Sequence, residues 1–324
     1  MIVRWGLDEL PGVLAELGVG RPLLVTTPRW TRLDLPVHGV YDGVRSHVPA
    51  DTVEAAVQAS RDADGLLAVG GGSAIDTAKA VSARRDLPVV SVPTTYSGAE
   101  WTAGFGVRDE TRGVKGGGGG GRVEGIVYEP ELTLTLPLGE TVGTAMNALA
   151  HCAEALYVEG RNAEADEEAL AGARLVSGAL PTVVAGGEDR EARRELLEGA
   201  MHAGAALADA GLGLGHAMAQ ALGGRYGIAH GAANALCLPA ALRFNEPVAA
   251  AAITRFSDAV GGGEAATRVE ELAALGGFRR LRDFGVPEDE LEDVAAATVA
   301  RSGARANPRR ATREEIAALF REIW

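Results

Sequence analysis

Cysteine is scarce in this chain, and the few cysteines present form no metal or disulfide motif. Only two, Cys152 and Cys237, occur among 324 residues, and both lie in apolar segments of helical composition. Two widely separated cysteines exclude a paired-cysteine zinc motif and a disulfide-rich scaffold. We interpret both as small buried apolar residues in a reducing compartment.

Long apolar runs and a surplus of basic residues are also missing. No stretch approaches the roughly 18 apolar residues of a membrane-spanning helix, and the N-terminus shows no basic-then-apolar leader. We therefore expect a cytoplasmic protein without a membrane partner. The chain has 31 basic and 44 acidic residues, a net charge of −13, which argues against nucleic acid because no basic stripe is present to neutralise phosphates.

What the sequence does contain is a hydrophobic pattern that changes near Pro137. Before it, short β-rich runs (23–27, 65–70, 89–92, 123–128) alternate with helical ones (51–62, 73–83), which is typical of a parallel sheet wound with helices. After it, alanine, leucine and glutamate recur with helical periodicity. We predict an α/β nucleotide-binding domain over residues 1–137 and an all-α substrate and catalytic domain over 138–324. The hexaglycine run at 116–121 is expected to be a flexible loop.

A glycine-rich turn follows one of the predicted strands. The apolar run from Leu66 ends in Gly70, Gly71 and Gly72, and Ser73 opens a helical segment that includes Asp76. Glycines let a backbone approach a pyrophosphate, and the free amides at the start of the next helix point at the anion. The turn alone is weak evidence, because glycine turns between strand and helix are common.

Three of the six histidines fall in segments with the spacing of a site. Asn147 and His151 are four residues apart, as are His216 and Gln220, and His230 follows fourteen residues after His216. Residues four apart lie on one face of a helix, so each pair points into one cavity if the segments face each other. Glu154 lies on the same segment as His151, and two interpretations of it stay open: a carboxylate of the site or a solvated surface charge.

These motifs together resemble the iron-containing (group III) alcohol dehydrogenase superfamily. The string Gly-Gly-Gly-Ser-Ala-Ile-Asp-Thr-Ala-Lys matches its cofactor-phosphate loop nearly residue for residue, and Pro-Thr-Thr-Tyr-Ser-Gly-Ala-Glu at 93–100 resembles a block of its maleylacetate reductases. The superfamily places an aspartate and three histidines around one divalent metal. Asn147 occupies the aspartate position, as in maleylacetate reductases, and Gln220 stands where the family usually has a histidine. The implied fold is that of dehydroquinate synthase.

The resemblance implies a cofactor and a set of cofactor-binding residues. We expect NADH or NADPH, with the pyrophosphate on the Gly70 to Ser73 amides. The other residues expected to bind the cofactor are Thr26, Arg29, Asp76, Thr94, Thr95 and Ser97. No acidic residue follows Val25 to bond the ribose hydroxyls, so nothing repels a 2′-phosphate and both nucleotides should be accepted.

The resemblance also implies the chemistry of the second half. His151, His216, His230, Gln220 and Asn147 are the expected catalytic residues. Without a carboxylate ligand, three imidazoles and an amide should hold a divalent metal weakly, so we expect none as a cofactor. If one binds, its ligands would be Asn147 and the three histidines. The expected substrate is a small anion, an unsaturated oxo-dicarboxylate, and the expected assembly is a homodimer.

Three other functions stay open. A metal-dependent alcohol dehydrogenase of the same fold would require Asn147 to ligate through its carbonyl oxygen. A sugar-phosphate cyclase of the dehydroquinate synthase type would hold NAD tightly and show no net oxidoreduction. A non-catalytic nucleotide-binding descendant would explain Asn147 and Gln220 as losses. Arg243 could pair with a substrate carboxylate or be an ordinary surface arginine.

Overall fold

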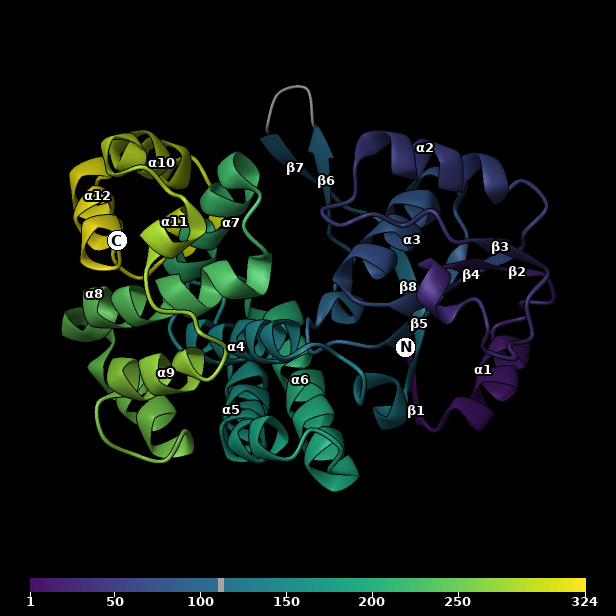
Figure 1. The fold of residues 1–324 in the computed structure, drawn as a ribbon, viewed down its shortest axis with the longest axis horizontal. Helices are drawn as coiled ribbons and strands as arrows, with labels where there is room; N and C mark the ends of the chain where they lie inside the picture. Colours follow the sequence, from purple (N-terminus) through teal and green to yellow (C-terminus); the bar gives the residue numbers. More distant parts are fainter. Residues whose placement is uncertain (110–113) are drawn as a thin grey trace. The chain divides into compact units, whose positions relative to one another are not determined.

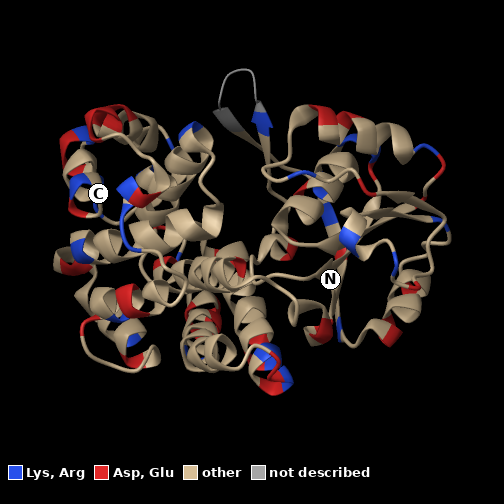
Figure 2. Cartoon of the chain, viewed as in Figure 1, with Lys and Arg blue, Asp and Glu red and all other residues tan. Residues whose placement is uncertain are grey.

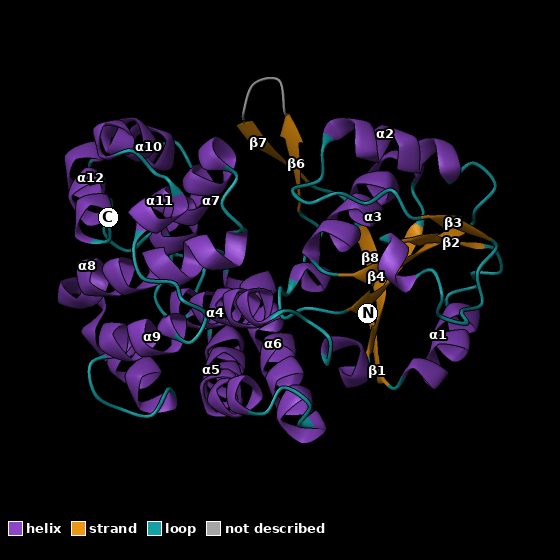
Figure 3. Ribbon diagram, viewed as in Figure 1, coloured by secondary structure: helices purple, strands orange, loops and turns teal. Residues whose placement is uncertain are grey.

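A computed structural model describes residues 1–109 and 114–324, and within this part of the chain two compact units are found. The first unit comprises residues 1–95 and 99–133, and the second comprises 96–98 and 134–324. All the strands belong to the first unit, and the described second unit consists of helices and loops (Figure 3). The structure confirms the predicted fold class, an α/β half followed by an all-α half.

The first unit is built on a six-stranded sheet in which every strand pair is parallel, in the order β1-β8-β5-β4-β2-β3 (Figure 1). Its strands are β1 Ile2–Trp5, β2 Pro22–Val25, β3 Gly39–Tyr41, β4 Gly65–Gly70, β5 Pro88–Pro93 and β8 Arg122–Tyr128. Its helices are α1 Leu10–Glu16, α2 Ala50–Ala59 and α3 Gly72–Arg85, with single 3₁₀ turns at Leu7–Glu9, Pro28–Trp30, Ala99–Trp101 and Pro130–Thr133.

The sheet is apolar on both faces. Leu24 and Leu67 pack in one buried cluster with residues of α1, and their chain neighbours Leu23 and Leu66 pack in another with residues of α2 and α3. Successive strand residues point to opposite faces, so continuous apolar runs in β2 and β4 are what a doubly covered parallel sheet requires. These continuous apolar runs are the reason why β2 and β4 could be predicted as strands from the sequence.

The hexaglycine prediction was wrong in part. Residues 116–118 belong to β7 (Val114–Gly118), which pairs antiparallel with β6 (Phe105–Asp109) in a separate two-stranded sheet. Gly117 lies opposite Gly106 and Gly118 opposite Phe105. Glycine is disfavoured in strands because it offers no side chain to pack, but its backbone still forms the ladder bonds. Only residues 119–121 lie outside the strand as expected of a loop.

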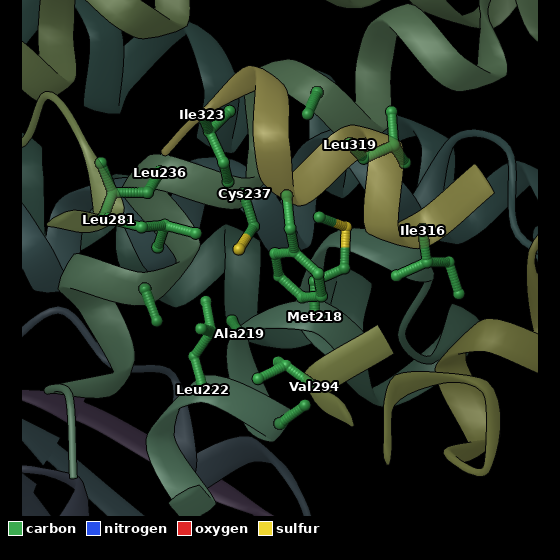
Figure 4. Packing of buried hydrophobic residues seen from close by; sticks show 14 of the residues in the cluster. Met218, Ala219, Leu222, Leu236, Cys237, Leu281, Val294, Ile316, Leu319 and Ile323 are labelled. Atoms are coloured by element: carbon green, nitrogen blue, oxygen red, sulfur yellow. The ribbon is translucent and has the colours of Figure 1, made fainter. Parts of the chain in front are cut away.

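The second unit packs nine helices around several apolar interfaces within the described chain. They are α4 Leu138–Ala155, α5 Ala163–Ala185, α6 Arg190–Ala210, α7 Leu214–Tyr226, α8 His230–Ala259, α9 Ala265–Ala274, α10 Leu291–Val299, α11 Ser302–Ala306 and α12 Arg313–Glu322, with 3₁₀ turns at Leu281–Phe284 and Glu288–Glu290. Figure 4 shows one buried cluster, in which Met218 and Leu222 of α7 meet Cys237 of α8 and Ile316 of α12. Cys152 and Cys237 are both buried and unpaired.

Helices α4 and α8 approach each other so closely that only glycine fits at the crossing. A Cβ atom on Gly231, in the first turn of α8, would overlap the carbonyl group of Gly143 in α4 and lie 2.9 Å from the amide nitrogen of Thr144. Gly143 in turn faces the amide of Ala232. The position of α8 against α4 therefore depends on this backbone contact. No helix in the described chain is long and apolar enough to cross a membrane.

We expect Gly231→Ala to destabilise the second unit by about 1–3 kcal/mol, the usual cost of overpacking, because a methyl group must push α4 and α8 apart. Gly178→Ala in α5 is the matched control. Nothing lies within 4 Å of a Cβ at Gly178, so that substitution should stabilise by about 0.5–1 kcal/mol by reducing the freedom of the unfolded chain. Urea denaturation of both variants measures the difference, and equal stability of the two would refute the crossing argument.

Candidate active site

Three helices of the second unit bring the predicted histidines together. Asn147 and His151 lie on α4, His216 on α7, and His230 is the first residue of α8. The rings of His151 and His216 stack with centroids 4.7 Å apart, and those of His216 and His230 lie 5.6 Å apart. The cluster predicted from residue spacing therefore exists, and we call these three rings the histidine cluster.

Glu154 fixes the orientation of His216. It lies one turn beyond His151 on α4 and is fully buried, as is His216. Its Oε2 atom accepts from His216 Nδ1 at 2.7 Å and from the Gly213 amide at 2.6 Å, and its Oε1 atom accepts from the His216 amide at 3.1 Å. Since the carboxylate requires a donor, Nδ1 of His216 carries hydrogen, and Nε2 presents its lone pair when the ring is neutral.

Two asparagine amides orient the other two rings. Asn147 Nδ2 donates to the Ser97 carbonyl at 2.9 Å and faces His151 Nε2 at 3.4 Å. Asn234, one turn after His230, donates from Nδ2 to Asn147 Oδ1 at 2.7 Å and lies 3.1 Å from His230 Nε2. Because an amide NH₂ group can only donate, Nε2 is the acceptor in both rings and Nδ1 carries the hydrogen.

Several polar atoms of the cluster are buried without a hydrogen-bond partner. They are His151 Nδ1, His216 Nε2 and Asn234 Oδ1. Burial lowers the pKa of His151 well below its usual value, and the neighbouring His216 and His230 lower it further, so His151 is neutral near pH 7. Unsatisfied polar atoms cost free energy when buried, and three in one cluster mark a place where a ligand can be bound.

Gln220 does not join the histidine cluster. Its side chain is half-buried, and its Oε1 atom accepts from Nη1 of Arg301 at 3.3 Å. It lies one turn beyond His216 on α7, as the spacing predicted, but its amide contacts Arg301, which no sequence motif marks. A catalytic role for Gln220 stays a prediction.

In the first unit the glycine turn has the geometry expected of an anion site. Gly70 ends β4 with φ 152°, and Gly71 precedes the first residue of α3, Gly72. A Cβ on Gly71 would lie 2.8 Å from Thr95 Cγ2, so a larger residue would collide with the predicted cofactor block. The first amides of a helix such as α3 have no partner within it and attract anions.

The other predicted cofactor residues divide into internally bonded and available ones. Thr95 Oγ1 is buried without a partner and Thr94 is held by its amide to the Gly70 carbonyl. Asp76 accepts from the Gly106 amide and forms an ion pair with buried Lys79 at 2.9 Å. Its carboxylate therefore anchors β6 and Lys79, and is less available to a ligand than the sequence suggested.

Thr26, Arg29 and Ser97 lie in different surroundings. Thr26 is fully buried and donates to the Val69 carbonyl at 2.6 Å, which links β2 to β4. Arg29 is exposed, with its guanidinium 4.7 Å from the centre of the Trp30 ring. Ser97 belongs to the second unit, where its carbonyl receives Asn147.

Sequence reasoning missed Asn234 and Arg301, and left Glu154 open. A signal for Asn234 was present, since it follows His230 by four residues and so repeats the spacing of Asn147 and His151. Glu154 follows Asn147 by seven residues, which is two helical turns on the same face. No comparable signal marks Arg301, because its neighbour Gln220 is 81 residues away.

Two models of one enzyme family match most of this chain. A model of the C-terminal part of the Fe-containing alcohol dehydrogenase family matches residues 141–324, and a model of iron-containing alcohol dehydrogenase matches residues 3–120. Maleylacetate reductase of Pseudomonas knackmussii is 36% identical over 98% of this chain and 93% of its own. That of Sphingobium indicum is 38% identical over 87% and 80%.

Solved structures agree with the sequence matches. Maleylacetate reductase from Agrobacterium tumefaciens has a TM-score of 0.90 and 31% identity, and covers 100% of this chain and 95% of its own. The maleylacetate reductase of Rhizobium sp. strain MTP-10005 gives the same values. The prediction drawn from the residue motifs, that the chain is similar to this family and most like maleylacetate reductases, is confirmed.

The expectation that no divalent metal is a cofactor is contradicted. Both matching models describe iron-containing enzymes. Asn147 contributes no charge, but the three imidazoles beside it suit iron and zinc. In the described residues no group of three or more His, Cys, Asp and Glu side chains is arranged to hold an ion.

The donor set nevertheless fits a metal. His216 Nε2 is a buried lone pair without a partner, and its Nδ1 is held by a carboxylate, the arrangement that accompanies metal-ligating histidines. His151, His216 and His230 are the residues that would hold the ion, and His151 and His230 would ligate through the Nε2 atoms that face Asn147 and Asn234 in this structure. The amide oxygen of Asn147 already accepts from Asn234.

Glu100, the last residue of the predicted cofactor block, gives a pH-dependent prediction. It is 1% exposed, accepts from the Tyr128 hydroxyl at 2.9 Å and has a second oxygen, Oε2, without a partner. Burial raises its pKa above the ordinary value of 4.5, an effect that the Tyr128 hydrogen bond and Lys79 only partly oppose. As pH rises, Glu100 therefore loses its proton in the unfolded chain before it does so in the folded protein.

The protonated Glu100 side chain contributes its full free energy of stabilisation below about pH 4.5. This contribution is lost as pH rises through the pKa of Glu100 in the folded protein, by at most about 1.4 kcal/mol per pH unit.

We expect Glu100→Gln, which cannot ionise, to be more stable than the wild type at pH 7 and equally stable at pH 4. Urea denaturation followed by tryptophan fluorescence measures this, since Trp5, Trp30 and Trp101 all lie in the first unit. A variant destabilised equally at both pH values would show that Glu100 is not a buried carboxyl of raised pKa.

Proposed function

The chain belongs to the iron-containing alcohol dehydrogenase family, and from this premise we propose that it reduces maleylacetate to 3-oxoadipate with a reduced nicotinamide nucleotide. It is an oxidoreductase, and its relatives named maleylacetate reductase match it over nearly its full length. The observation that carries the proposal is the histidine cluster, with Asn147 in the position where the resemblance leads us to expect aspartate. A cluster without a carboxylate ligand suits a substrate that itself carries two carboxylates.

The reaction adds a hydride and a proton to a carbon–carbon double bond conjugated with a ketone. Hydride joins the alkene carbon remote from the ketone, the electron pair moves onto the ketone oxygen as an enolate, and a proton then joins the other alkene carbon. NADH or NADPH, when bound, supplies the hydride. The protein must therefore stabilise an oxyanion and deliver one proton.

The histidine cluster contains groups for both tasks. His151 is neutral, its Nδ1 carries hydrogen, and this atom is buried without a partner, so it can donate to the enolate oxygen. With Nδ1 held by the Glu154 carboxylate at 2.7 Å, His216 directs only Nε2 into the cluster, and this atom would carry the proton for the substrate carbon when no metal ion occupies it. A divalent metal held by these imidazoles would act as a Lewis acid on the ketone oxygen.

The proposal includes both nucleotides, because no carboxylate follows β2 to repel a 2′-phosphate and Arg29 is exposed there. It also includes a homodimer in the cytoplasm, with a role in the breakdown of aromatic compounds. Light scattering after gel filtration measures the oligomeric state.

Oxidation of NADH and NADPH, followed at 340 nm against maleylacetate, simple aldehydes and simple ketones, tests the function. We expect maleylacetate to be the preferred substrate with either nucleotide, and a preference between nucleotides below about a hundredfold, which corresponds to roughly 2.7 kcal/mol. Turnover of aldehydes alone would instead indicate an alcohol dehydrogenase.

Histidine variants test the assignment of roles. His216→Ala and His230→Ala should each lower turnover by roughly a hundredfold to ten-thousandfold, the range for loss of a general acid. Gln220→His should leave turnover at saturating substrate nearly unchanged, since Gln220 lies outside the cluster and contacts Arg301 instead. Turnover is measured at saturating NADH and maleylacetate. Near-wild-type rates for both alanine variants would show that the cluster is structural.

A further inference from the structure

Arg301 carries a charge that no described carboxylate neutralises. Its Nη1 atom donates to the neutral Gln220 amide at 3.3 Å, and its Nε atom is buried with no partner. Burial lowers its pKa, with no charged neighbour acting against that effect. A half-buried guanidinium without a counter-ion is costly.

Two other arginines of the second unit are neutralised by carboxylates, whereas buried Arg193 donates to neutral oxygens from both Nε and Nη1. Arg243, which the sequence offered as a partner for a substrate carboxylate, lies 2.8 Å from Glu270, 3.0 Å from Glu322 and 3.6 Å from Glu264. Arg225 is likewise paired with Glu290. The chain has thirteen more acidic than basic residues, so a scarcity of carboxylates does not explain Arg301.

The fold holds Arg301 next to the helix that carries His216. Arg301 immediately precedes α11, and α11 packs on α7. Gly303 allows this, because a Cβ there would overlap the carbonyl of Gly213 and lie 3.5 Å from Ala217 Cβ. Gln220, the contact of Arg301, is one turn beyond His216, about 6 Å along the axis.

We propose that Arg301 binds a carboxylate of the oxo-dicarboxylate substrate and that Gln220 positions it. A guanidinium offers parallel N–H groups that match a carboxylate, and Nε is already without a partner. The amide oxygen of Gln220 holds the side chain without cancelling its charge, which a carboxylate would do. A histidine in this place would repel Arg301 whenever it was protonated. The inference rests on the proposed function, since it names the residue that recognises that substrate.

Steady-state kinetics of Arg301→Gln provides the test. We expect KM for maleylacetate to rise by about 10- to 150-fold, the range for loss of a hydrogen bond to a charged group, with KM for NADH unchanged and kcat reduced much less. Arg301→Lys, which keeps the charge but not the planar fork, should be intermediate. With the dimethyl ester of maleylacetate, which has no carboxylate, Arg301→Gln and wild type should react equally.

Arg305→Gln is the matched control. Arg305 lies on α11, the short helix that Arg301 immediately precedes, is exposed, and bonds the Ala300 carbonyl, so its replacement should leave every constant unchanged. Thermal unfolding of all variants checks that they are folded. A KM for maleylacetate that Arg301→Gln leaves unchanged, or an equal loss on the ester, overturns the proposal.

A binding measurement separates this inference from the function itself. If the wild type does not oxidise NADH with maleylacetate, the proposed function is wrong, and calorimetric titration with adipate still tests Arg301. Weaker adipate binding by Arg301→Gln, by about tenfold or more, would support carboxylate recognition. Equal binding by the two proteins, or none by the wild type, would overturn it.

Discussion

The second unit depends on one buried carboxylate. Glu154 is surrounded by three N–H donors: two backbone amides at the start of α7 and the ring of His216. A buried carboxylate is tolerated only when its oxygens are satisfied in this way. The same bonds therefore fix where α7 begins, how it faces α4 and which nitrogen of His216 is free. The position, orientation and tautomer of the His216 ring all follow from one side chain.

The asparagines complete this arrangement without adding charge. Three imidazoles close together would repel one another if protonated, and burial together with this repulsion keeps His151 neutral. Neutral amides can orient neutral rings without changing that balance, whereas a carboxylate at position 147 would favour protonated rings or a bound cation. Asn147 thus affects how many protons the three rings carry, as well as the affinity of the histidine cluster for a metal ion.

Regular features of the fold and site were predictable from the sequence, and features that depend on tertiary contacts were not. The strands of the parallel sheet could be predicted because both of their faces are apolar, and the histidine cluster because helical spacing places Asn147 and His151 on one face. The glycines of β7 were misread because composition favours a loop, while a pairing partner in β6 decides otherwise. The role of Arg301 could not be predicted from the sequence. It depends on the lack of a carboxylate partner among the described residues and on a contact with Gln220, 81 residues away.

The Ser97 carbonyl has a consequence for how the site can change. A carbonyl oxygen only accepts, so it forces the Asn147 amide to present nitrogen toward it and oxygen toward Asn234, and Asn234 must then offer nitrogen to His230. One main-chain carbonyl therefore sets which way each hydrogen bond points from Asn147 through Asn234 to His230. Substitution of the Ser97 side chain cannot reverse it, so the hydrogen placement on two rings is protected from mutation at the residue that determines it.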